Sequence, residues 1–139
     1  MKIKNFIFIA ALMITFGVAK AQNNTEWTPI LVSMDGTNTF KGVEAYYSLS
    51  NCAGSDVLLI KLKNTNDKAV KAQWVNAIVS NDEKEHYGKT KLVSVNLKAT
   101  SETVGACNAK PTELVVKLSD YGVTLKEFKT IVGSSFYVE

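Results

Sequence analysis

Hydrophobic and polar residues alternate with a period of two along most of the chain after residue 26, which predicts β-strands rather than helices. In the clearest example Val43, Ala45, Tyr47 and Leu49 fall on one face and polar residues fill most of the other. Such alternation is typical of a strand with one buried face. Further strands are predicted at residues 27–34, 57–63, 70–80, 92–97, 113–118 and 136–138.

The segment 70–80 is the longest predicted strand. Trp74 and Ile78 share one face, while Val75, Ala77 and Val79 make the far half of the opposite face apolar as well. We therefore expect this half of the strand to be covered on both sides.

Residues 125–132 are ambiguous, because Leu125, Phe128 and Val132 fit helical spacing whereas Phe128, Thr130 and Val132 fit a strand. The β-branched residues favour a strand. The whole pattern predicts an all-β fold, an immunoglobulin-like β-sandwich of seven or eight antiparallel strands, because two stacked sheets bury the apolar faces.

The first 21 residues follow a different pattern. Lys2 and Lys4 precede an apolar stretch over residues 6–18, and Ala19-Lys20-Ala21 fits a small-x-small cleavage site. This combination predicts a signal peptide over residues 1–21 and a single domain over residues 22–139. The product is expected to be exported, periplasmic or secreted, with no membrane span in the mature chain.

Removal of that segment changes the charge of the protein. The full chain carries a formal net charge of +3, with 16 basic residues that are all lysine. Three of these lysines precede residue 22 and all 13 acidic residues follow it, so the mature chain is neutral. A neutral surface without arginine argues against a nucleic-acid partner.

The chain has two cysteines, Cys52 and Cys107. In an exported protein such a pair is most simply a disulfide, which would contribute roughly 4 kcal/mol in the chain-entropy model. The alternatives are two free buried thiols, or a metal site that also uses the single histidine, His86.

The order Cys52, Trp74, Cys107 is similar to that of the immunoglobulin fold, although Trp74 follows Cys52 by 22 residues and both cysteines lie in predicted loops. The chain also resembles small exported bacterial proteins of uncharacterised function. The matching residues are Asn51-Cys52, 57–65, Trp74, Gly105-Ala106-Cys107 and Phe128. This resemblance implies the sandwich and the disulfide, and it supplies no catalytic residues.

Candidate catalytic chemistry is confined to the charged segment 81–89. His86 lies near Ser80 and would be the base of any enzyme, or would form a weak metal site with Asp82 and Glu85. A solvated loop is the simpler interpretation, because no nucleophile elbow or phosphate-binding loop is present in the sequence. We therefore expect no enzymatic activity, no cofactor and no metal.

The aromatic residues Trp27, Tyr46 and Tyr87 are the candidate ligand-binding residues, because each is expected near the surface. The sequence thus favours a non-enzymatic protein-binding or structural module whose partner is an envelope protein. The alternative is a carbohydrate-binding module whose exposed aromatic rings stack on a glycan.

Overall fold

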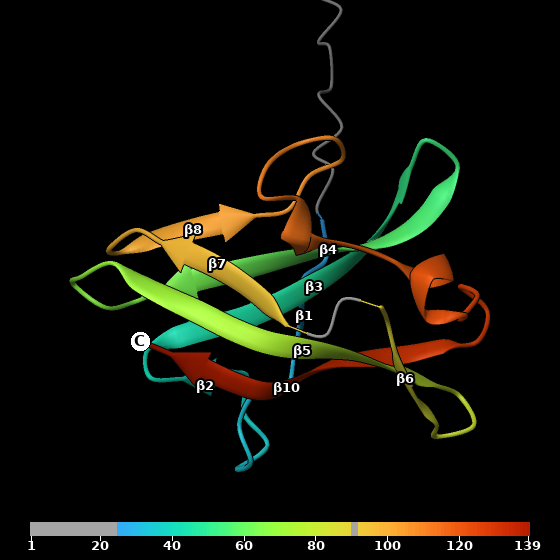
Figure 1. Cartoon of the computed structure of the whole chain (residues 1–139), viewed down its shortest axis with the longest axis horizontal. Coiled ribbons are helices and arrows are strands. Elements are labelled where there is room, and N and C mark those ends of the chain that lie inside the picture. Colours follow the sequence, from blue (N-terminus) through green and yellow to red (C-terminus); the bar gives the residue numbers. More distant parts are fainter. Residues whose placement is uncertain (1–24, 90–91) are drawn as a thin grey trace, which may run out of the picture.

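The computed structural model describes residues 25–89 and 92–139, so the predicted signal peptide lies outside the described residues. Within them the chain forms ten strands and two short 3₁₀ turns, with no α-helix. The strands form two antiparallel sheets, shown in Figure 1, which bury their facing sides against each other. The all-β fold is confirmed, and the strand count is ten rather than seven or eight.

In the first sheet, β3 (Val43–Cys52) and β4 (Ser55–Asn64) form a long central hairpin. The two-residue strands β1 (Thr28–Pro29) and β2 (Thr39–Phe40) pair with the free edge of β3. The other edge of β4 pairs with the remaining strands of this sheet, β8 (Ser101–Val104) and β9 (Val115–Lys117). The hairpin thus joins two consecutive long strands within one sheet. The predicted immunoglobulin-like topology is not confirmed.

In the second sheet, β5 (Val70–Ser80) lies at the centre and β10 (Phe128–Val138) pairs along one edge. The other edge of β5 pairs with β6 (Glu85–Tyr87) and β7 (Val93–Leu97). The ambiguous residues 125–132 therefore end in a strand. The prediction of a loop over residues 81–89 was wrong for residues 85–87, because a tight turn at residues 81–84 folds them back onto β5.

The N-terminal strand closes one side of the sandwich. After β1 has paired with β3, Leu31 forms a parallel bridge to Val132 of β10 in the other sheet. Ile30 and Val32 point into the core on either side of that bridge. Gly133 permits this close approach, because a Cβ atom there would lie only 2.9 Å from a Val32 methyl group.

A second link joins the loops at the far end of the sandwich. The Asn64 side chain is buried, and its amide donates to the carbonyls of Lys68 at 2.9 Å and Lys98 at 3.0 Å. Its oxygen accepts from the backbone N–H of Asn66, whose own amide donates to the carbonyl of Lys41. One buried amide thus connects loops from both sheets.

Cys52 and Cys107 form the disulfide, with their Cα atoms 5.5 Å apart. The bond ties the tip of the β3–β4 hairpin to the loop between β8 and the turn η1 (Thr112–Leu114). Both alternatives for the cysteines are thereby removed. Among the described residues, no helix is long and apolar enough to cross a membrane.

We expect Asn64→Ala to lower the free energy of unfolding by about 2 to 3 kcal/mol, because it leaves buried backbone groups without partners. Urea denaturation followed by circular dichroism measures this. The control is Asn96→Ala, at an exposed position of β7, which should change stability by less than about 0.5 kcal/mol. Equal effects of the two substitutions would contradict the role given to Asn64.

Replacing both cysteines, Cys52→Ala with Cys107→Ala, should lower stability by about 2 to 4 kcal/mol. The bond spans 55 residues, so its loss frees a long segment of the unfolded chain. The same urea titration measures the change. A loss below about 1 kcal/mol would show that the bond constrains the unfolded chain less than this model requires.

Candidate functional site

Two of the three aromatic residues singled out in the sequence meet on the outer face of the first sheet. The ammonium of Lys61 lies 4.7 Å from the ring centroid of Trp27 and 4.7 Å from that of Tyr46. Tyr46 on β3 is directly opposite Lys61 on β4, and Trp27 immediately precedes β1. Side chains alternate along β3, and because Ala45 and Tyr47 point into the core, Tyr46 between them points outward. We refer to Trp27, Lys61 and Tyr46 as the aromatic–lysine cluster.

The surroundings of this cluster are polar and carry both charges. The Tyr46 hydroxyl donates to the Glu44 carboxylate at 2.8 Å, and this hydrogen bond raises the pKa of Tyr46 above its ordinary value. Glu44 is opposite Lys63, which is opposite Glu102 on β8. Cation–π contacts at exposed sites are worth about 0.5 to 1 kcal/mol each, so Lys61 restricts both rings without burying them.

Tyr87 lies apart from the cluster. It is on β6 in the second sheet, 55% exposed, and its hydroxyl donates to Glu85 at 2.6 Å. The structure therefore brings together Trp27 and Tyr46 and leaves Tyr87 on a different face. Lys61 is the member of the cluster that sequence reasoning missed.

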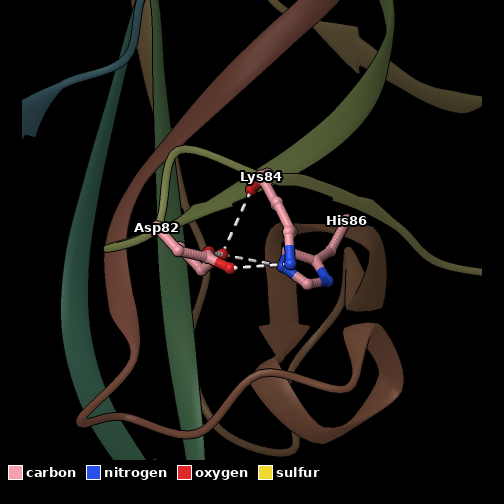
Figure 2. Close-up of polar contacts among 4 residues, drawn as sticks. Asp82, Lys84 and His86 are labelled. Carbon is pink, nitrogen blue, oxygen red and sulfur yellow. Dashed lines mark hydrogen bonds and ion pairs between the residues drawn. The ribbon is translucent and has the colours of Figure 1, made fainter.

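The residues considered for catalysis lie at the end of the sandwich. Ser80 Oγ is 2.8 Å from His86 Nε2, and it also donates to the Asp82 carboxylate. Figure 2 shows Asp82, Lys84 and His86 grouped around this point. The ammonium of Lys84 lies 3.1 Å from Asp82.

The direction of these hydrogen bonds decides whether His86 could act as the base that activates Ser80. The Ser80 hydroxyl has one proton, and three acceptors lie within reach of it: the Asp82 carboxylate, the Lys84 carbonyl at 3.3 Å and His86 Nε2. When that proton goes to Asp82, His86 Nε2 supplies an N–H to the Ser80 oxygen. A base that activates a serine must instead accept its proton. The hydroxyl of Ser80 is the main cause that lowers the pKa of Asp82 to about 2, with Lys84 contributing next. These contacts link residues at both ends of the β5–β6 turn.

The metal site considered in the sequence is not formed. Glu85 and His86 are adjacent on β6 and therefore point to opposite faces of the sheet, with Glu85 beside Tyr87. In residues 25–89 and 92–139, no group of three or more His, Cys, Asp or Glu side chains is placed to hold a metal ion.

A hollow of about 540 Å³ adjoins these residues. It lies between the β5–β6 turn and the segment that leads into β10, whose Lys126 and Glu127 face it. Hydrogen bonds from the backbone and hydroxyl of Thr124, at 2.9 and 2.7 Å, hold Glu127 and lower its pKa. No local sequence signal links residues 80–86 to residues 122–127, because only the sandwich brings them together.

We expect Ser80→Ala to raise the pKa of Asp82 from about 2 towards its ordinary value of 3.8. Because the folded pKa is depressed, the stability that Asp82 contributes is present above pH 4 and is lost as the pH falls towards 2. Carboxylate ¹³C NMR titration measures the change, and Asp35, hydrogen-bonded to Thr37, serves as an unaffected reference. An unchanged Asp82 pKa would show that Ser80 does not donate its proton to Asp82.

Comparisons with known proteins supply no homologue from which the role of this site could be inferred. No protein-family model, curated protein or solved structure matches the chain. The resemblance to small exported bacterial proteins thus stays a prediction, and the interpretation of the site depends on its own residues.

Proposed function

We propose that this chain is an exported, non-enzymatic module that binds a protein of the cell envelope through its aromatic–lysine cluster. The disulfide and the finding that no described helix could cross a membrane are consistent with export. The N-terminal pattern of charge, apolar core and cleavage site supports the same compartment.

The observation that carries the proposal is the position of Lys61 between Trp27 and Tyr46 on an outer sheet face. Trp and Tyr are enriched among the residues that dominate binding energy at protein interfaces. Rings that are already restricted lose less side-chain entropy when a partner binds. The charges of Glu44, Lys63 and Glu102 around the cluster would form the polar rim.

The non-enzymatic part of the proposal is supported by the group at Ser80. A Ser80 proton donated to the Asp82 carboxylate, which is ionised at neutral pH, leaves none for His86 to accept, and this supports a structural role for the group. A role in holding the β5–β6 turn together accounts for the side chains of Ser80, Asp82 and His86 without any catalytic role.

The carbohydrate-binding alternative is supported by the convergence of Trp27 and Tyr46 on one face. A sugar ring stacks on the face of an aromatic ring, and Lys61 lies over these rings. Lys61 would have to move before a glycan could use the ring surfaces that it now covers. This requirement makes a protein partner the better-supported proposal.

Crosslinking in intact producing cells, with a tagged chain and mass spectrometry of co-purified proteins, tests the proposal. We expect one dominant, saturable partner, and a loss of about tenfold or more of its crosslink with Trp27→Ala combined with Tyr46→Ala. Tyr87→Ala is the matched control, because Tyr87 also bonds a glutamate two residues earlier on a strand. It should leave the crosslink unchanged.

Three outcomes would count against this reading. Equal crosslink losses with the double variant and with Tyr87→Ala would show that the cluster is not the contact. A specific glycan bound on an array, but no protein partner, would favour the carbohydrate alternative. Hydrolysis of an ester, peptide or glycoside that His86→Ala abolishes would overturn the non-enzymatic proposal.

A further inference from the structure

A half-buried cation lies at the centre of the aromatic–lysine cluster. The Lys61 ammonium is 4.7 Å from the ring centroid of Trp27 and 4.7 Å from that of Tyr46, and its side chain is only partly exposed. Residues 25–89 and 92–139, which the structure describes, contain every acidic residue of the chain. Lys61 takes part in none of the ion pairs found among them, which are Lys71–Glu139, Lys84–Asp82 and Lys129–Glu83. Its charge is therefore partly removed from water without a carboxylate to compensate it.

The next lysine on the same face of β4 has a different environment. Lys63 is exposed, and it lies between Glu44 and Glu102, which are opposite it on β3 and β8. Lys61 has Tyr46 opposite it on β3 and an apolar residue opposite it on β8. Carboxylates thus flank Lys63 on both sides, whereas neither residue opposite Lys61 carries a negative charge.

Apolar surface adjoins Lys61 on the side away from those carboxylates. Val104 is opposite Lys61 on β8 and is 44% exposed. The next outward row towards the hairpin tip pairs Leu59 with Val115, and both of these side chains are partly exposed. The surface on this side of the cluster therefore combines one cation with three aliphatic side chains.

We propose that the envelope protein bound by the cluster presents an acidic side chain, Asp or Glu, to Lys61 and packs an apolar residue beside it on Val104. This inference rests on the proposed function, because it names the chemistry of the partner at the same site. A carboxylate accepts hydrogen bonds from the ammonium while both rings keep their contacts with it, so the cluster does not have to rearrange. The partner thereby supplies the negative charge that this chain does not place beside Lys61.

A cationic side chain of the partner is the less favoured occupant. The rings of Trp27 and Tyr46 could hold a lysine or an arginine by cation–π contacts. Lys61 already lies over both rings, so an incoming cation would have to displace it against charge repulsion. An anion is attracted to the same position.

Carbodiimide crosslinking in intact producing cells, with the tagged chain and peptide mapping by mass spectrometry, tests the inference. The carbodiimide activates a carboxylate, and the amine of a lysine in contact with it attacks the activated carbonyl, forms an amide bond and releases the urea. No spacer remains between the two residues. We expect this amide bond to join Lys61 to an Asp or a Glu of the partner.

Substitution of Lys61 gives a second readout, with a photoactivated crosslinker in place of the carbodiimide so that loss of the amine does not itself remove the link. Lys61→Met should lower the yield of the partner by about tenfold, because it keeps the aliphatic chain and removes the charge. Lys61→Arg should retain the yield within about threefold, because it restores a cation that also contacts aromatic rings.

Lys41→Met is the matched control. The Lys41 ammonium also lies over two rings, 5.7 Å from the centroid of Phe40 and 5.0 Å from that of Tyr137, and it donates to the Val138 carbonyl at 3.5 Å. Lys41 lies in the turn between β2 and β3, and its side chain contacts β10 of the other sheet. Its substitution should leave the yield of the partner unchanged, and circular dichroism checks that each variant is folded.

The outcomes separate this inference from the proposed function. A yield that falls with Trp27→Ala combined with Tyr46→Ala, but not with Lys61→Met, would overturn the inference and leave the proposed function standing. Equal losses with Lys61→Met and Lys41→Met would also overturn it, as would carbodiimide links to the partner that all avoid Lys61. Links from Lys61 to an acidic glycan, with none to a protein, would overturn the acidic protein partner. Recovery of no partner would overturn both proposals.

Discussion

The fold depends on the burial of two sheet faces against each other, and Trp74 lies in that contact. Its ring stacks on Phe136 with the centroids 5.7 Å apart, and its indole N–H donates to Asn76 at 2.7 Å. The polar atom of the largest core side chain is therefore satisfied inside the sandwich. Because side chains alternate along a strand, fixing the inner face of β5 also fixes which residues lie on its outer face.

The two outer faces that result differ in chemistry. On the first sheet, charged residues surround Trp27 and Tyr46, and Lys61 holds both rings in a mixed polar surface. On the second sheet, the outward side chains of Val75 and Val79 are partly exposed, whereas Ala77 between them is buried. Both faces follow from the same alternation, and they differ in how much charge they carry.

Sequence patterns were most reliable where a strand is long and has one buried face. Residues 43–49 lie within β3, and Trp74 and Ile78 point into the core as the spacing predicted. The alternating pattern did not predict β6 within residues 81–89, because a strand of three residues in a charged segment is too short to show alternation. The strands that the pattern did not predict, β2, β6 and β8, are two to four residues long, and pairing rather than periodicity defines them.

The sequence alone determined the all-β class, most of the inner faces of the long strands and the favoured disulfide pairing, because strand periodicity and the number of cysteines can be read directly from it. Leu49, expected on the buried face of β3, is instead 48% exposed. It also identified Trp27, Tyr46 and His86 as residues to examine. Only the tertiary structure decided that Trp27 and Tyr46 meet at Lys61, and that Ser80 lies between Asp82 and His86. These outcomes depend on strand register and sheet order, which arise from contacts between residues far apart in the chain.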